Sequence, residues 1–104
     1  MSNYYVYILA SKRNGTLYIG VTDDILKRMQ EHKYGVYEGF SKKYSVHRLV
    51  YFEIFEQASD SIKRERQLKE WKRQWKVELI EKHNQQWNEL YGILQDMDPD
   101  FRRE

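Results

Sequence analysis

Residues 4–21 read YYVYILASKRNGTLYIGV and contain the clearest structural signals of the chain. Its first seven residues form a continuous apolar run bounded by polar residues, which predicts a strand covered on both faces. The Asn-Gly pair at residues 14–15 favours a tight hairpin, because both residue types tolerate positive φ. Residues 16–21 are then expected to return as a second, antiparallel strand.

A helix is expected directly after this hairpin. Thr22 has the side chain of an N-cap, and the two aspartates that follow it favour the positive end of a helix dipole. The helix is expected to end near residue 34, where a glycine follows. Residues 33–45 mix glycines, lysines and aromatics without a period, which predicts an ordered loop.

The second half of the chain predicts one strand and two helices. Residues 46–55 are rich in β-branched and aromatic side chains, which favours a third strand. Ser59 and Asp60 are expected to cap a long helix that continues to about His83. A shorter helix is expected around residues 87–94. The long helix should turn one apolar arc toward the core, consisting of Leu68, Trp71, Trp75 and Leu79.

This order of elements predicts an α+β fold. Three antiparallel strands form a sheet in the order strand-strand-helix-strand-helix-helix, with the helices packed on it. A chain of 104 residues fits one domain. We expect that domain over residues 1–95, followed at residues 96–104 by an acidic, frayed tail.

Composition excludes several classes of function. The chain has no cysteine, which rules out disulfides, thiol catalysis and cysteine-based zinc sites. No apolar run approaches the roughly 20 residues of a membrane span, and no signal peptide is expected, which favours a cytoplasmic location. Residues 1–82 hold 16 Lys and Arg against 11 Asp and Glu, whereas residues 83–104 hold 2 against 5. A basic body with an acidic tail suits a polyanionic partner such as DNA.

Two similar tripeptides lie on the strands of the predicted hairpin. Tyr5-Val6-Tyr7 and Tyr18-Ile19-Gly20 are separated by ten residues. Arg28 and His32 follow one turn apart on the next helix, and Glu65 lies on the long helix. This set resembles the GIY-YIG nuclease superfamily. It is most similar to the small stand-alone bacterial members, which look like the N-terminal nuclease domain of the bacterial DNA-repair excinuclease.

The resemblance implies a DNA endonuclease that hydrolyses phosphodiester bonds with Mg²⁺ or Mn²⁺. By this resemblance, Tyr7 acts as the general base or helps to form it, and Tyr18 orients the attacking water or the phosphate. Arg28 stabilises charge on the phosphate, His32 carries a proton, and Glu65 binds the metal. The resemblance covers roughly residues 3–90, and the first tripeptide departs from the family pattern, with Tyr-Val-Tyr in place of Gly-Ile-Tyr.

The residue types suit this chemistry. Phosphoryl transfer depends on positioning and charge stabilisation, which a guanidinium and a hard cation supply. Mg²⁺ keeps several waters and needs only one or two carboxylates, so a single glutamate suffices. A tyrosine with a pKa near 10 is a poor base at neutral pH, and a nearby cation lowers that pKa.

Each residue also has a purely structural explanation. In a chain with nine tyrosines, Tyr7 and Tyr18 can be packing residues, with Tyr5 and Tyr7 on one face of the first strand. The arginine and histidine of the first helix can be ordinary surface residues. Glu65 can be the i,i+4 partner of Lys69, an exposed pair that stabilises a helix by about 0.2–0.5 kcal/mol.

Six lysines are candidate DNA contacts, because ammonium groups bind phosphates and neighbouring aromatics can stack on unpaired bases. They lie on the loop and along one border of the long helix: Lys33, Lys42, Lys43, Lys69, Lys72 and Lys76. The five catalytic candidates are expected to converge on one concave surface.

Two departures from larger family members leave the target open. Those members carry an Asn after the metal-binding helix, and Asn84 is the nearest candidate for it. They also carry a second DNA-binding domain, which has no counterpart here. We therefore expect a structure-selective or weakly sequence-specific nuclease, in DNA repair or recombination, or one that depends on a protein partner. The alternatives are a non-catalytic nucleic-acid binding module and a protein adaptor that uses residues 87–94.

Overall fold

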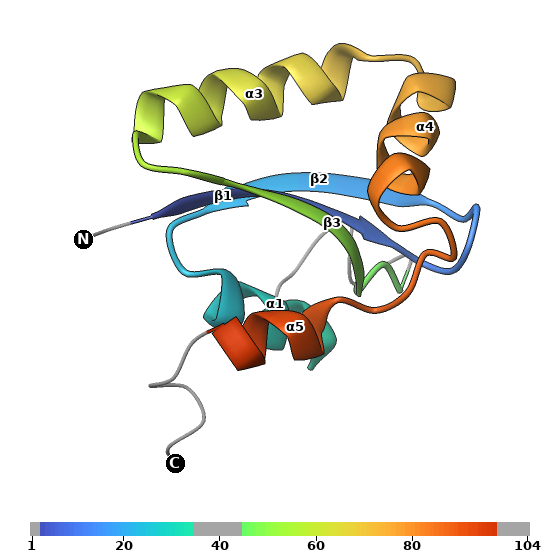
Figure 1. Ribbon diagram of the computed structural model, residues 1–104, viewed down its shortest axis with the longest axis horizontal. Helices are drawn as coiled ribbons and strands as arrows, with labels where there is room; N and C mark the ends of the chain where they lie inside the picture. The colour runs from blue at the N-terminus through green and yellow to red at the C-terminus, as the bar shows by residue number, and fades with distance from the viewer. Residues whose placement is uncertain (1–2, 35–44, 98–104) are drawn as a thin grey trace.

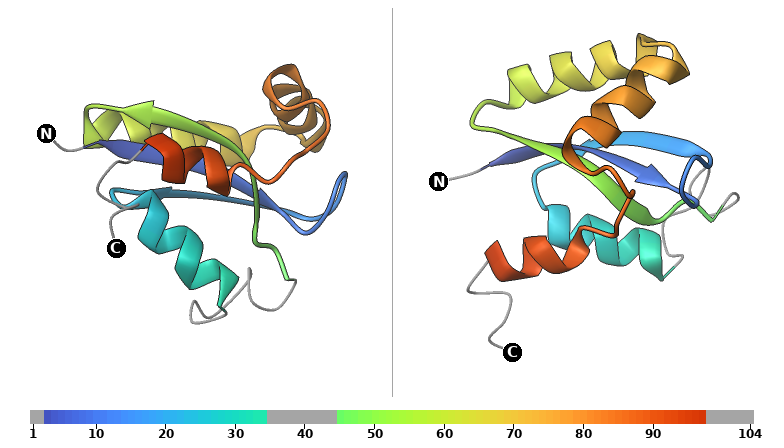
Figure 2. Two further views of the ribbon diagram at one scale, coloured as in Figure 1. Left: turned by 60° about the horizontal axis from the view of Figure 1, so that its bottom comes forward. Right: turned by 45° about the vertical axis from the view of Figure 1, so that its right-hand side comes forward.

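The computed structural model describes residues 3–34 and 45–97 and consists of a sheet between two layers of helices (Figure 1). The elements are β1 (Tyr4–Ala10), β2 (Leu17–Thr22), α1 (Ile25–Lys33), β3 (Arg48–Phe55), α3 (Ala58–Glu70), α4 (Arg73–His83) and α5 (Tyr91–Met97). Helices α3 and α4 cover one face of the sheet, and α1 and α5 cover the other (Figures 1 and 2). The predicted α+β class and the three-stranded antiparallel sheet are confirmed.

Strand β1 is the centre of the sheet, whose order is β2-β1-β3. Both neighbours run antiparallel to it, so that Tyr7 lies opposite Gly20 on β2 and opposite Phe52 on β3. A register shift occurs along β3 between the partners of Ile8 and Leu9. Because a central strand is covered on both faces, its last five residues are fully buried, as the apolar run predicts.

Alternate side chains of β1 enter two different cores. Val6 and Ile8 pack with Leu68 of α3 and Ile80 of α4. Tyr7 lies on the other face, in a core shared with α1 and α5. Burying a large apolar side chain stabilises a fold by about 1.5–3 kcal/mol, so β1 anchors both helical layers.

The turn between β1 and β2 follows the Asn-Gly prediction. Asn14 has φ 61°, in the left-handed region that Asn and Gly tolerate. The amide of Gly15 donates to the carbonyl of Lys12 at 2.9 Å, and the amide of Ser11 donates to the carbonyl of Thr16 at 3.0 Å.

The cap of α1 lies two residues later than predicted. Thr22 ends β2, and its Oγ1 accepts from the amide of Asp24 at 3.1 Å. Asp24 is the N-cap, with its carboxylate accepting from the amide of Lys27 at 3.2 Å. The hydroxyl therefore shapes the strand-to-helix turn, and the carboxylate caps the helix.

The predicted long helix is wrong, because the chain breaks between α3 and α4. Trp71 and Lys72 have extended backbones, with ψ 146° and 157°. A straight helix over residues 59–83 would be about 37 Å long, whereas the break lets α4 turn at the end of α3 and bring Ile80 to the core that Leu68 occupies. Trp75, placed in the apolar arc by the prediction, is 47% exposed.

Helix α3 also begins earlier than predicted. Its first residue is Ala58, and Gln57 is the N-cap without a side-chain hydrogen bond. Ser59 and Asp60 lie within the first turn, where the aspartate still favours the positive end of the helix.

The segment from α4 to α5 is not the helix predicted from residue 87. Trp87 has φ 59°, is fully buried, and donates from Nε1 to Glu81 at 2.7 Å. Asn84 is buried too, and its Nδ2 donates to the carbonyl of Val50 at 3.0 Å and to that of Asn88 at 2.9 Å. This segment closes part of the outer edge of β3, and helix α5 starts only at residue 91.

Candidate active site

The ring of Tyr7 lies across Gly20, its partner residue on β2. A methyl group added at Gly20 would lie 2.5 Å from Cζ and 3.0 Å from Cε1 of Tyr7, which no packed structure allows. An isolated glycine inside a strand marks such a close approach. The glycine of the second tripeptide is therefore required by the tyrosine of the first.

Three rings from three elements meet beside this contact. The hydroxyl of Tyr7 lies 3.2 Å from Nε2 of His32, which belongs to α1. The ring centre of Tyr18 is 6.3 Å from that of Tyr7 and 5.4 Å from that of His32. The structure thus brings together one predicted residue from each strand of the hairpin and one from the first helix.

His32 is neutral at physiological pH. Its side chain is buried, and this burial lowers its pKa to about 4, with smaller contributions from the positive charge of Arg28 and from His47. A neutral imidazole has one ring nitrogen that donates and one that accepts. In the tautomer protonated at Nδ1, the Tyr7 hydroxyl donates to Nε2, and the imidazole holds the phenol in place.

Arg28 lies one turn before His32 on α1. Its Nε forms an ion pair of 3.2 Å with Glu31, and both side chains are partly exposed. It lines a small polar hollow together with Asp23, Asp24 and Lys27 at the start of the helix. Glu31 also lines this hollow, so three carboxylates stand beside the two cations.

Glu65 comes from the other helical layer. It lies on α3, which covers the face of the sheet opposite α1 (Figure 1), and the convergence of the five side chains on one surface stays a prediction. Its side chain is 13% exposed and pairs with the ammonium of Lys69 at 2.6 Å. The i,i+4 pair that provides its structural explanation is therefore present.

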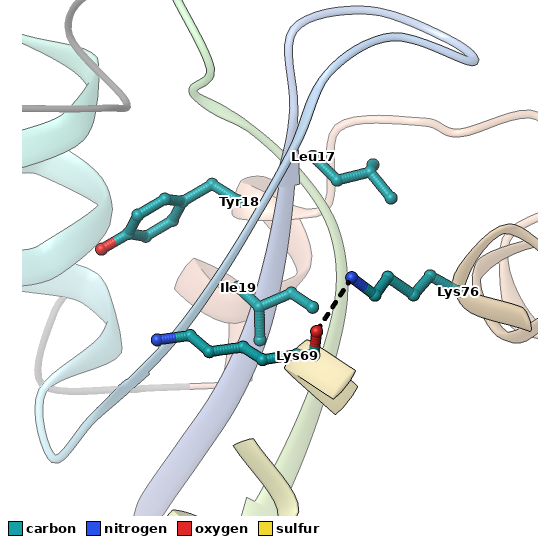
Figure 3. A pocket seen from close by; sticks show the side chains of 5 residues that line it. All are labelled: Leu17, Tyr18, Ile19, Lys69 and Lys76. Carbon is teal, nitrogen blue, oxygen red and sulfur yellow. Dashed lines mark hydrogen bonds between the residues drawn. The ribbon is translucent and has the colours of Figure 1, made fainter. Parts of the chain in front are cut away.

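Strand β2 is an edge strand, so side chains at its free edge can approach either helical layer. Lys69 lines a hollow at this edge with Tyr18, Leu17, Ile19 and Lys76. Figure 3 shows the Tyr18 ring and the Lys69 ammonium extending toward the same side. A site that uses both Tyr18 and Glu65 would therefore run around the edge of β2.

The lysines of the second half do not form one continuous row, because the helix that was to carry them is broken. Lys69 pairs with Glu65, and the ammonium of Lys72 lies 5.0 Å from the ring centre of Trp75. Lys76 donates to the carbonyl of Lys69 at 3.5 Å.

The loop lysines are described only in part. The ammonium of Lys33 lies 4.0 Å from Oε1 of Glu89 and 5.0 Å from the ring centre of Tyr91. Lys42 and Lys43 lie outside the described residues. Their contact with DNA stays a prediction, as does that of the other lysines.

A partly buried ion pair next to Glu65 was not expected from the sequence. Arg64 donates to both carboxylate oxygens of Glu53 on β3, with its shortest contacts at 2.9 Å, and the hydroxyl of Tyr51 donates to the same carboxylate. Burial opposes ionisation of Glu53, but these hydrogen bonds outweigh it, and its pKa is lowered. The pair holds α3 against β3 and so positions the turn that carries Glu65.

Glu65 is the one carboxylate among the five candidate site residues, and a metal site there stays a prediction. Within residues 3–34 and 45–97, no three His, Asp or Glu side chains form a cluster. A cation near β2 would therefore depend on Glu65 and on water, which suits Mg²⁺. One Glu65 oxygen is already paired with the Lys69 ammonium.

Comparison with known proteins places this arrangement in a family. Residues 3–78 match the family described as the GIY-YIG catalytic domain. The chain belongs to the GIY-YIG family. GIY-YIG domains form a nuclease superfamily, so the resemblance inferred from the two tripeptides is confirmed.

Relatives of this GIY-YIG protein are UPF0213 proteins. One from Staphylococcus saprophyticus is 39% identical over 80 residues, covering 77% of this chain and 96% of the relative. Another, from Syntrophus aciditrophicus, is 40% identical over 84 residues, covering 80% and 95%. The solution NMR structure of a UPF0213 protein from Bacillus halodurans is 28% identical, with a TM-score of 0.51, and the match covers 79% of this chain and 86% of that one. These names state no activity.

None of the helices in the described parts of the chain is long and apolar enough to cross a membrane.

We expect Gly20→Ala to lower the free energy of unfolding by about 1–3 kcal/mol, because the added methyl overlaps the Tyr7 ring. Urea unfolding measures the effect. Gly92→Ala is the matched control, since nothing lies within 4 Å of an added methyl there and alanine favours the helix. Equal stability of the two variants would show that Tyr7 is not held against Gly20.

The pKa of His32 predicts a loss of stability in mild acid. Between pH 6.5 and about pH 4, the unfolded chain binds a proton at this residue that the folded chain does not. The free energy of unfolding should therefore have its full value above pH 6.5 and fall by about 3 kcal/mol as the pH drops to 4. The fall in the free energy of unfolding should be smaller in His32→Gln. His83→Gln should show the same fall as the parent, because His83 is exposed. Urea unfolding at a series of pH values tests this, and equal slopes for all three proteins would contradict it.

Proposed function

We propose that this GIY-YIG protein is a metal-dependent endonuclease that hydrolyses phosphodiester bonds in DNA. The observation that carries the proposal is the contact between the Tyr7 hydroxyl and the neutral His32 imidazole. The hydroxyl and the imidazole lie within hydrogen-bonding reach, which is the geometric condition for proton transfer in general-base catalysis.

The other residues have roles that follow from their chemistry. Tyr18 lies at the mouth of the ring cluster and at the hollow along β2, where its hydroxyl can orient water or a phosphate oxygen. Arg28 presents a guanidinium beside the same cluster, which suits charge developing on a phosphate. Its pairing with Glu31 is partly exposed, so a phosphate can compete for it at low free-energy cost.

Glu65 is the residue that would hold a divalent cation, either Mg²⁺ or Mn²⁺. When bound, such a cation supplies charge stabilisation at the phosphate. Strand β2 lies at the edge of the sheet, so a phosphate backbone crossing this edge can meet Tyr18 on one side and Glu65 on the other. The Arg64–Glu53 pair keeps the Glu65 turn of α3 fixed against the sheet during this contact.

The candidate DNA-binding residues of the chain indicate how selective the nuclease is for its target. The described lysines provide phosphate contacts, which fix position but carry no sequence information. We infer a structure-selective or weakly sequence-specific enzyme with a place in DNA repair or recombination, aided in target choice by a protein partner. A non-catalytic nucleic-acid binding module is the second candidate, favoured by the position of Glu65 in the layer opposite Tyr7.

We expect Glu65→Gln to reduce cleavage at least about a hundredfold while DNA binding stays equal or becomes tighter. Gln keeps the size of Glu but lacks the anionic oxygen that a hard cation requires. Cleavage of branched, nicked and linear DNA with Mg²⁺, with Mn²⁺ and with chelator measures the effect. Glu70→Gln, at an exposed position of the same helix, should cleave as the parent does. Full activity of Glu65→Gln would leave Glu65 as a lysine partner only.

DNA binding should weaken steeply with salt. A few phosphate contacts by Lys and Arg predict a log–log slope of magnitude about 3–5 between affinity and salt concentration. Fluorescence anisotropy with a labelled duplex in chelator measures this slope without cleavage. Binding that does not change with salt, or that is undetectable at low salt, would contradict both the nuclease and the binding module.

A further inference from the structure

The break between α3 and α4 leaves one tryptophan at the surface. Trp75 is 47% exposed, whereas Trp87 is fully buried and Trp71 is partly buried against the core that contains Leu68. A continuous helix would have turned Trp75 toward that core. An exposed indole is a common anchor of binding surfaces, because it combines a large apolar area with a flat π face.

The two rings at the break, Trp71 and Trp75, pack edge to face. Their ring centres are 6.0 Å apart, with an interplanar angle of 88°. The guanidinium of Arg64 lies 5.2 Å from the Trp71 ring centre, and the ammonium of Lys72 lies 5.0 Å from that of Trp75. Arg64 is fixed by its hydrogen bonds to Glu53, but Lys72 is exposed, and a cation–π contact at an exposed site is worth only about 0.5–1 kcal/mol. A ligand can therefore displace the lysine from the Trp75 ring.

The chain around the two rings is strongly basic. Residues 63–76 hold seven Lys and Arg against two Glu, a net charge of +5, whereas the net charge of the whole chain is +2. The surface formed by Trp71, Lys72 and Trp75, here the tryptophan patch, thus lies in the most basic part of the molecule. This charge favours a polyanion over a basic or neutral protein surface.

The tryptophan patch adjoins the hollow along β2. Lys76, the residue after Trp75, lines that hollow together with Lys69 and Tyr18 (Figure 3). The Lys76 ammonium donates to the carbonyl of Lys69 at 3.5 Å, which links the start of α4 to the end of α3. A phosphate backbone bound by the two lysines would therefore bring neighbouring nucleotides to Trp75.

We propose that the tryptophan patch binds single-stranded DNA, with an unpaired base stacked on Trp75 and Lys72 on an adjacent phosphate. Aromatic side chains stack on unpaired bases, whereas the base faces of a duplex are already covered by their neighbours. The inference rests on the proposed function and deepens it. It names the substrate class as DNA that carries an unpaired stretch, such as a flap or an overhang.

The affinity of the full chain for a short labelled oligothymidine, measured by anisotropy in chelator, tests the stacking contact. Stacking contributes about 1–3 kcal/mol per base, so Trp75→Ala should weaken this binding at least about fivefold, while affinity for a blunt duplex should change less than about twofold. Ile62→Ala, which removes another exposed apolar side chain of α3, should leave both affinities unchanged. Unchanged oligothymidine binding by Trp75→Ala, or an equal loss for the duplex, overturns the inference.

Tryptophan fluorescence reports the stacking itself and does not depend on the stability of the alanine variant. A stacked thymine quenches indole emission, so oligothymidine should quench the parent protein. Trp75→Phe keeps an aromatic ring and should bind within about threefold of the parent, but should lose most of the quenching. Undiminished quenching in Trp75→Phe would show that the base does not lie on Trp75, and the inference would fail.

The dependence on salt separates the ring from the lysine. Lys72→Gln should lower the magnitude of the log–log slope for oligothymidine by about 0.7, because one phosphate contact is lost. Trp75→Ala should leave the slope unchanged, because stacking releases no counterion. A slope lowered equally in both variants would assign the Trp75 effect to phosphate contacts and contradict the inference.

The inference and the proposed function can fail separately. If the parent cleaves DNA with Mg²⁺ or Mn²⁺ but Trp75→Ala binds oligothymidine as the parent does, the inference fails and the nuclease stands. If the parent binds oligothymidine through Trp75 but cleaves no DNA, the inference stands and the protein is the non-catalytic binding module.

Discussion

The contact between the Tyr7 ring and Gly20 is the constraint on which the site depends. Tyr7 lies on the central strand and is fully buried, and its ring crosses β2 at the one position without a side chain. Along this path its hydroxyl lies 3.2 Å from Nε2 of His32 on α1. The same contact sets the separation of Tyr7 and Tyr18, so the two tripeptides form one structural unit and not two independent motifs.

The site is divided between two helical layers, and an edge strand joins them. The ring cluster and Arg28 belong to the layer of α1, whereas Glu65 belongs to the layer of α3. Because β2 has a neighbour on one side only, its residues 17–19 line a hollow along its free edge together with Lys69 of α3 and Lys76 of α4. The ion pair between Arg64 and Glu53 then matters for the site, since it fixes the helix that carries Glu65.

The charges of the candidate site are largely neutralised within the free protein. Arg28 pairs with Glu31, Glu65 pairs with Lys69, and His32 is uncharged because burial lowers its pKa to about 4. Such a site has no strongly uncompensated charge, which protects the stability of a small domain.

Features that depend on residue type and local spacing could be predicted from the sequence. They are the apolar run of β1, the Asn-Gly turn, the three-stranded sheet and the family pattern of Tyr7, Tyr18 and His32. Four features became visible in the folded chain alone: the break at residues 71–72, the buried turn at Trp87, the pKa of His32 and the layer of the helix that carries Glu65. These features depend on burial and on contacts between residues far apart in the chain. The periodicity of one helix cannot show that α4 must turn back so that Ile80 and Leu68 share a core.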